Sequence, residues 1–159
     1  MEMPVFTIRG KNHRERGVDY GVQCKELIQG VLERYIRFFN GGHTAVSWDE
    51  AKVISKEFLP FIRSYSPELL DELEGIAQGA DVEFDDLLTL NSRSEAMTLV
   101  RRPPSDKEEL DGCSSVAVLP DASANGHTIL AQNWDTYTWQ EYGTVILQIL
   151  RAVSYTHLR

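Results

Sequence analysis

The spacing of apolar residues changes near residue 100, and this change constrains the fold of the 159-residue chain more than any other feature. Before it, apolar side chains recur every three to five residues, the spacing of helices with one buried face. After it come short β-type runs. The stretch between them, RRPPSDKEEL at residues 101–110, combines two prolines with a run of charged residues, which is typical of an exposed linker. Helices followed by antiparallel strands predict an α+β fold.

End signals divide the helical part into separate helices. Ser47 and Glu50 have the order of a capping box, and Ser66 followed by Pro67 has the N-cap and first-turn residues of a further helix. Gly79 is expected to close that further helix. We therefore expect a strand at Val5–Ile8 and helices over residues 15–39, 67–79 and 84–97. Another helix is expected to open after Ser47, to carry Ile62 on its apolar side, and to be ended or bent by Pro60.

The most informative stretch follows the linker and begins with one of the two cysteines. β-type runs at Ser115–Leu119 and Thr128–Ala131 are separated by turn-forming residues, which predicts two antiparallel strands. Cys113 would begin the first strand, and Asn133 and Asp135 would end the second. Antiparallel neighbours bring the end of one strand beside the start of the other. A thiol, an amide and a carboxylate should therefore meet there, as a candidate nucleophile site.

A third strand is expected at Thr144–Leu150. This run is apolar on both faces, and such a strand needs cover on both sides of its sheet. Little chain remains to supply that cover. We therefore expect the sequence to be cut short.

The composition excludes several classes of function. Sixteen basic and 24 acidic residues give a net charge of −8, which repels phosphate backbones and anionic lipids, so we expect no nucleic-acid or membrane partner. No run of about 18 apolar residues and no secretory signal are present, which predicts a cytoplasmic protein with reduced cysteines. Cys24 lies in a predicted helix and is expected to be inert packing. The cysteines and histidines lack metal-ligand spacing, so no metal is expected.

A cysteine attacks only as a thiolate, so Cys113 needs a base. His127 lies between the two predicted strands at the end away from Cys113, which makes a Cys–His hydrolase the less favoured alternative. Cleavage of the chain between Gly112 and Cys113 would supply another base, because a free α-amine titrates near neutral pH and would lie beside the thiol. Gly112 suits such a cleavage, since without a Cβ it lets the thiol approach its carbonyl.

The residues at this junction resemble those of a known family. GCSS at residues 112–115, followed by QNWD at residues 132–135, is similar to the acyl-coenzyme A:6-aminopenicillanic acid (isopenicillin N) acyltransferases, which are N-terminal-nucleophile (Ntn) hydrolases. The stretches ELEGIAQGA at residues 72–80 and LNSRSE at residues 90–95 look like the same family, as do Arg16-Gly17 and Tyr20-Gly21. The resemblance covers residues 6 to 150. Gln132 stands where the related bile-salt and penicillin V amidases carry an Arg, which disfavours a bile-salt hydrolase.

This resemblance implies an αββα sandwich and self-cleavage before Cys113. Cys113 would match the family nucleophile, Asp135 the carboxylate that orients the new α-ammonium group, and Asn133 a further polar contact near the site. The reaction would be hydrolysis of a linear amide in a small molecule, or transfer of its acyl group, through an acyl-enzyme thioester. No cofactor would be needed, acyl-coenzyme A would be a candidate co-substrate, and the two chains would stay associated after cleavage.

The chain departs from the family in length, because family members are much longer. Residues 1–150 would be the N-terminal part of one Ntn domain, with a helical pro-segment up to residue 112 and the start of the catalytic chain at residue 113. Residues 151–159 show no resemblance and are expected to be a tail of foreign origin. The missing part would supply oxyanion-hole donors, so this fragment alone is expected to be inactive. The alternative from another class is a non-catalytic fragment or binding module with an inert Cys113.

Overall fold

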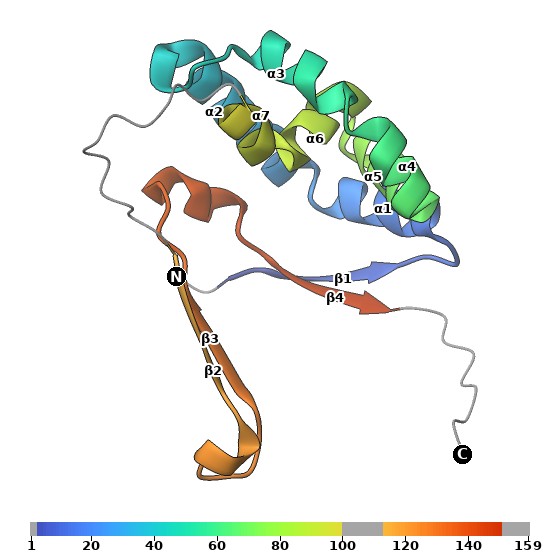
Figure 1. Cartoon of the computed structure of the whole chain (residues 1–159). Coiled ribbons are helices and arrows are strands. Elements are labelled where there is room, and N and C mark those ends of the chain that lie inside the picture. Colours follow the sequence, from blue (N-terminus) through green and yellow to red (C-terminus); the bar gives the residue numbers. More distant parts are fainter. Residues whose placement is uncertain (1–2, 100–112, 151–159) are drawn as a thin grey trace, which may run out of the picture. The chain divides into compact units, whose positions relative to one another are not determined.

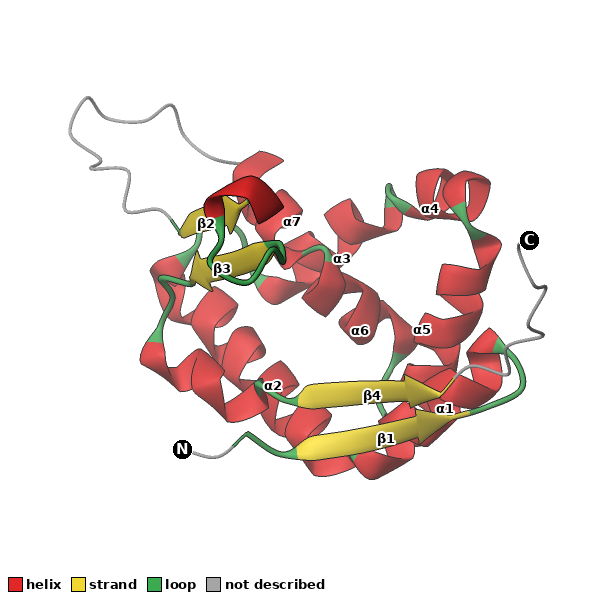
Figure 2. Ribbon diagram, turned by 90° about the horizontal axis from the view of Figure 1, so that it is seen from below, coloured by secondary structure: helices red, strands yellow, loops and turns green. Residues whose placement is uncertain are grey.

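The computed structural model describes residues 3–99 and 113–150 of the chain. The predicted linker at residues 101–110, Gly112 of the predicted cleavage bond and the tail at residues 151–159 lie outside the described residues. The described residues fall into two compact units, one formed by residues 3–99 with 142–150 and the other by residues 113–141. Each unit contains its own pair of strands (Figure 2).

The larger unit is mostly helical (Figure 1). Along the chain it contains β1 (Val5–Arg9), α1 (His13–Gln23), α2 (Lys25–Phe38), a π-helical turn η1 (Phe39–His43), α3 (Trp48–Lys56), α4 (Leu59–Tyr65), α5 (Pro67–Ala80), α6 (Phe84–Asn91), α7 (Arg93–Leu99) and β4 (Ile146–Leu150). No helix within the described residues is long and apolar enough to cross a membrane. The mixture of helices and strands agrees with the predicted α+β class, while the αββα sandwich stays a prediction.

The smaller unit is a β-hairpin. It contains β2 (Ser114–Val118), a short 3-10 helix η2 (Pro120–Ala122) and β3 (Ile129–Asn133). A second 3-10 helix, η3 (Thr138–Gly143), follows the hairpin and leads the chain from the smaller unit to the larger. The two strands predicted at Ser115–Leu119 and Thr128–Ala131 are therefore confirmed as β2 and β3.

The predicted capping box is present at the start of α3. Ser47 Oγ accepts a hydrogen bond from the Glu50 backbone N–H at 3.3 Å, and the Glu50 carboxylate accepts one from the Ser47 N–H at 2.8 Å. These reciprocal bonds satisfy backbone donors that a helix start leaves without partners. Pro60 lies in the first turn of α4 and Pro67 in the first turn of α5, where a missing N–H costs little.

Two of the predicted helices are each broken in the structure. The helix expected over residues 15–39 is α1 and α2, which meet at Cys24 with φ of −108° and ψ of 15°. The helix expected over residues 84–97 is α6 and α7, which meet at Ser92. The buried Ser92 hydroxyl donates to the Leu88 carbonyl at 2.9 Å and lies 2.8 Å from the Ser55 hydroxyl. This side chain therefore competes with the backbone for a helical acceptor, which favours a break.

Gly79 does not end α5, so that prediction is wrong. The helix continues to Ala80, and the left-handed residue after it is Asp81, with φ of 57°. Gly79 lies instead against α1, because a Cβ added there would lie 2.8 Å from the Val22 nitrogen. We call the glycines of this close contact the glycine seam: Gly17 and Gly21 of α1 with Gly75 and Gly79 of α5. The seam brings together two segments that both carry the family resemblance.

One part of the core of the larger unit lies where α5 and α6 meet the junction of α1 and α2. Its buried cluster consists of Cys24, Ile28, Ala77, Ala80 and Leu87. Cys24 is 2% exposed, which confirms that it packs in the core, and burial raises the pKa of its thiol. A buried, protonated thiol is a poor nucleophile.

The two strands of the larger unit are parallel, so the prediction of antiparallel strands throughout is wrong. β4 pairs with β1 from Val5↔Ile146 to Arg9↔Leu150. Parallel neighbours need a long crossover connection, and the helices between them belong to that connection. Ile146 is 46% exposed and Ile149 is 44% exposed. The described residues therefore do not supply the cover that so apolar a strand needs.

Candidate functional site

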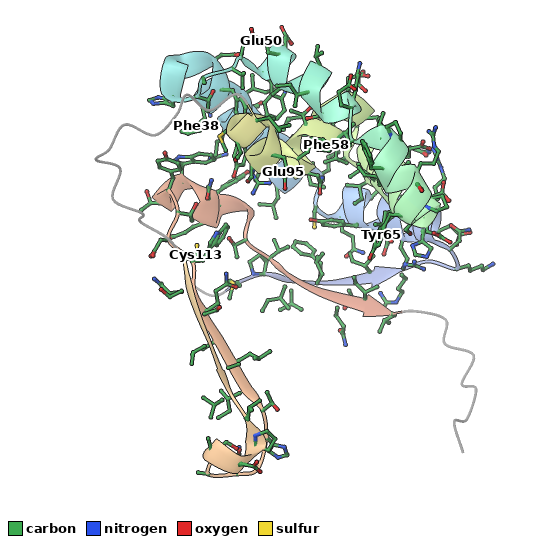
Figure 3. All side chains as sticks on the ribbon, in the orientation of Figure 1. Phe38, Glu50, Phe58, Tyr65, Glu95 and Cys113 are labelled. Carbon is green, nitrogen blue, oxygen red and sulfur yellow. The ribbon has the colours of Figure 1, made fainter. Side chains whose placement is uncertain are left out.

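The register of the hairpin places the predicted site residues at one end of the smaller unit. β2 and β3 are antiparallel over five residue pairs, with Ser114 opposite Asn133 at one end. Cys113 comes directly before β2, and Asp135 comes two residues after β3. Figure 3 shows Cys113 at this end of the hairpin, away from the turn that joins the strands. The structure thus brings the thiol, the amide and the carboxylate together.

Two hydrogen bonds connect these three residues. The Cys113 thiol donates to the main-chain carbonyl of Asp135, with 3.7 Å between sulfur and oxygen. The Asn133 side-chain amide donates to one carboxylate oxygen of Asp135 at 2.8 Å. Asn133 therefore orients the Asp135 carboxylate. Asp135 thus accepts the thiol hydrogen bond with its main-chain carbonyl and the amide hydrogen bond with its carboxylate.

Cys113 is exposed, in contrast with the buried Cys24. A nucleophilic thiol must be reachable by the carbonyl that it attacks, and exposure meets this requirement. Within the described residues Cys113 is therefore not a buried strand thiol. Exposure alone does not activate a thiol, so a base is still needed.

His127 does not pair with Cys113 inside the hairpin. It lies just before β3, and its backbone N–H donates to the Asn125 side chain at 3.2 Å in the turn. Five paired residues separate this turn from Cys113, which corresponds to about 15 Å along an extended strand. The arrangement within the smaller unit thus disfavours the Cys–His alternative.

The predicted cleavage bond is described from one side only, because Gly112 lies outside the described residues. Cys113 itself immediately precedes the hydrogen-bonded strand β2. Among the described residues there is no group of three or more His, Cys, Asp and Glu side chains that could hold a metal ion.

Aromatic side chains follow the site along the chain. The rings of Tyr137 and Trp139 are stacked, with centroids 5.9 Å apart and an angle of 14° between their planes. Trp134, between Asn133 and Asp135, is 53% exposed. The stacking of Tyr137 on Trp139 was not predicted, although aromatic residues at alternate positions are the signal that could have indicated it.

A separate pocket of about 450 Å³ lies in the larger unit among α4, α5, α6 and α7. Much of its wall is apolar, with Phe58, Ile62, Leu69, Leu70, Leu73 and Leu88. Glu72 and Glu95 also line it, and the Glu72 carboxylate lies 3.2 Å from His13 Nδ1 and 3.6 Å from Arg16 Nη2. Figure 3 labels Phe58 and Glu95. Sequence reasoning missed this pocket because its wall comes from separate helices whose packing no local pattern shows.

Comparison with known proteins places the chain beside two curated enzymes. No model of a protein family matches the chain. It is 28% identical over 156 residues to the beta-alanyl-dopamine/carcinine hydrolase of Drosophila melanogaster, an alignment covering 93% of this chain and 38% of that protein. It is 29% identical over 136 residues to the acyl-coenzyme A:6-aminopenicillanic-acid-acyltransferase 40 kDa form of Emericella nidulans, covering 82% of this chain and 35% of that protein.

These similarities confirm the family resemblance found in the sequence, and they extend over most of the chain. The chain spans little more than a third of the length of these relatives, 38% and 35% respectively.

Proposed function

Because this chain resembles the acyl-coenzyme A:6-aminopenicillanic acid acyltransferases, we propose that it is part of a hydrolase or acyltransferase of the cysteine Ntn type. The names of both relatives, a hydrolase and an acyltransferase, support the general role. One observation carries the finer proposal: an exposed Cys113 comes directly before strand β2, and its thiol donates a hydrogen bond to the main-chain carbonyl of Asp135. Such a position suits a residue that becomes a chain terminus.

Self-cleavage would start with the attack of Cys113 Sγ on the carbonyl carbon of Gly112. The Gly112–Cys113 C–N bond breaks, the proton lost by the thiol ends on the nitrogen, which becomes the α-amine, and a thioester links Gly112 to the sulfur. Water then hydrolyses the thioester, which gives a carboxylate at Gly112 and a free thiol at Cys113. The products are one chain ending at residue 112 and another beginning with a cysteine.

Substrate turnover would use the amine that this cleavage creates. The α-amine of Cys113 takes the thiol proton, and the thiolate attacks the carbonyl carbon of a linear amide. The amide C–N bond breaks, the leaving amine takes up the proton, and the acyl group stays on sulfur as a thioester. Water then releases a carboxylic acid, or an acceptor amine takes the acyl group. Acyl-coenzyme A is a candidate acyl donor in place of the amide, in which case its C–S bond breaks and the coenzyme A thiol leaves with the proton.

Asp135 and Asn133 have supporting roles in this scheme. The Asp135 carboxylate would hold and orient the α-ammonium group, as the orienting carboxylate of a catalytic triad does. The 2.8 Å hydrogen bond from Asn133 fixes the direction of that carboxylate. Asn133 is thus proposed as a positioning residue and Cys113 as the nucleophile.

The complete protein is proposed to form an αββα sandwich, of which residues 1–150 are one part of a single domain. Relatives of greater length support this, as do the half-exposed apolar residues of β4. The substrate is proposed to be a small-molecule amide. The two relatives are named for different compounds, so these names do not select one substrate for this chain.

Intact-mass analysis of the full 159-residue chain tests the proposal. We expect two chains divided between Gly112 and Cys113. Cys113→Ala should leave one chain, whereas the matched control Cys24→Ala should leave the division unchanged, because Cys24 is buried in the other unit. A chain that hydrolyses amides while keeping its full mass would refute the mechanism.

A second experiment separates the proposal from its two rivals. An inert Cys113 in a binding module predicts a full-length chain whose Cys113→Ala variant behaves identically in every assay. A Cys–His hydrolase predicts that His127→Ala abolishes activity without changing the chain length. The proposed mechanism predicts that His127→Ala is cleaved at the unaltered rate.

A further inference from the structure

We propose that Tyr142 and β4 form the surface that holds the chain beginning at Cys113 onto the helical part after the backbone is cut. We call residues 142–150 the docking segment. The inference rests on the proposed function for its biological meaning, because only a cut before Cys113 separates this segment from residues 3–99. The contacts themselves lie entirely within the larger unit.

The Tyr142 ring packs against Gly30 and Arg34 of helix α2. The guanidinium carbon of Arg34 lies 3.7 Å from the centroid of the Tyr142 ring, a cation–π contact. Arg34 Nη1 also donates to the Gly30 carbonyl at 2.9 Å, which fixes the guanidinium over the ring. The ring therefore lies under an arginine that its own helix holds in place.

Gly30 makes room for the same ring. A Cβ added at Gly30 would lie 2.7 Å from Cε1 and 2.7 Å from the hydroxyl oxygen of Tyr142. Glycine in the interior of a helix lowers helix stability, so its presence in α2 needs a reason. The close approach of Tyr142 supplies that reason. The next residue, Gly143, lies equally close to α2, because a Cβ there would meet the Val31 side chain.

β4 extends the contact along β1. Five residue pairs form the parallel ladder. The Ile146 N–H donates to the Pro4 carbonyl at 2.9 Å, and the Thr7 hydroxyl donates to the Gln148 side chain at 3.2 Å. Each of these contacts joins a residue before position 112 to one after position 113, so none of them depends on the bond that would be cut.

The backbone pairing of β1 with β4 and the contacts of the Tyr142 ring differ in how strictly they select the segment that binds. Backbone pairing between two strands fixes direction but tolerates many side chains. Arg34, Gly30 and Tyr142 require particular residue types, since the ring needs both the open space and the cation. These three residues therefore set the register in which the docking segment binds, and the strand pair adds length to the surface.

The test cuts the chain independently of Cys113. Residues 104–109 of the full chain are replaced by the recognition sequence of a site-specific protease, in a Cys113→Ala background with an affinity tag at the N-terminus. After folding and cleavage, we expect the smaller piece to remain on the affinity resin with the larger piece. A dilution series followed by gel filtration gives its dissociation constant.

Tyr142→Ala should raise this dissociation constant at least ten-fold, and Arg34→Ala should raise it by several-fold. The control is Arg37→Ala, because Arg37 is exposed on the same helix. Tyr142→Ala changes the docking segment and leaves the sequence of α2 unaltered. Circular dichroism of the uncut variant is the folding control, because it shows whether the helices still form.

Release of the smaller piece from the unaltered protein, or equal retention by Tyr142→Ala, would overturn the inference. These outcomes are independent of self-cleavage, since the added protease makes the cut. Conversely, a chain that never cleaves itself would defeat the proposed function and leave the docking result standing.

Discussion

Replacing Gly79 with alanine tests whether the glycine seam is a requirement of helix packing. Helix propensity alone predicts that Gly79→Ala stabilises the protein by about 0.8–1.0 kcal/mol, because glycine is the poorer helix former. The structure predicts the opposite sign. The added Cβ would lie 2.8 Å from the Val22 nitrogen and 3.0 Å from the Gly21 Cα. These are backbone atoms that no side-chain rotation can remove, so α1 and α5 would have to separate.

The size of the effect follows from two opposing contributions. Overpacking of a close contact costs about 1–3 kcal/mol, and the upper part of that range applies where backbone must shift. Subtracting a propensity gain of about 1 kcal/mol leaves a net destabilisation of about 1–2 kcal/mol. For a domain of this size, each kcal/mol lowers the melting temperature by about 2–4 °C.

Urea unfolding followed by far-UV circular dichroism measures this difference in the free energy of unfolding. The matched control is Asp71→Ala, because Asp71 is exposed on the same helix and alanine there changes propensity without crowding a neighbour. We expect Asp71→Ala to be neutral or to stabilise by up to about 0.7 kcal/mol. Stabilisation by Gly79→Ala as well would refute the reasoning, since α1 could not then lie against that position.

Three further predictions concern a helix cap, the two thiols and the candidate site. Backbone and side-chain hydrogen bonds from the capping serine lower the pKa of Glu50, so its contribution to stability is present above its ordinary pKa and is lost as pH falls through the folded-state value. Urea titrations should therefore show Glu50→Ala destabilising the protein at neutral pH and the difference shrinking in acid. Iodoacetamide should alkylate Cys113 in the folded protein and Cys24 only after denaturation, as peptide mass mapping would show; early labelling of both would contradict the assigned burial. Asn133→Ala should slow amide turnover by an active, cleaved form of the protein about 10-fold or more, the equivalent of a lost hydrogen bond to a charged Asp135, because Asp135 acts on the amine that cleavage creates; an unchanged turnover rate would remove Asn133 from the scheme.

The features that sequence reasoning predicted correctly are those with local signals. The capping box at Ser47 is set by residues three positions apart, and the hairpin is set by β-type runs around a turn. The proximity of Cys113 to Asp135 follows from the same local pairing, since antiparallel strands joined by a turn share their ends. The amino-acid sequence alone therefore indicates where the candidate site lies.

The features that were mispredicted depend on distant partners. Glycine is the residue type expected just after a helix, but α5 continues past Gly79 to Ala80. This glycine lies against Val18 and Val22 of α1, a contact that the local sequence does not indicate. The Ser92 hydroxyl at the break between α6 and α7 also lies 2.8 Å from the Ser55 hydroxyl of another helix, a contact that no pattern within residues 84–97 indicates. The parallel pairing of β1 with β4 has no signal in either strand, because the direction of a partner is decided by the whole connection between them.

The same contrast between local and distant contacts divides the groups that the proposed chemistry needs. The thiol and the carboxylate that would orient the new amine belong to one hairpin, so register alone arranges them, and a slip by one residue would turn Cys113 to the opposite face. Oxyanion donors, each worth about 10²–10³ in rate, are proposed to come from outside this hairpin. Attack on the Gly112 carbonyl also forms an oxyanion, so both steps gain from such donors, but only substrate turnover uses the α-amine of Cys113 as its base. Cleavage of this chain without turnover agrees with the mechanism, whereas turnover without cleavage contradicts it, because the base arises only when the bond before Cys113 is broken.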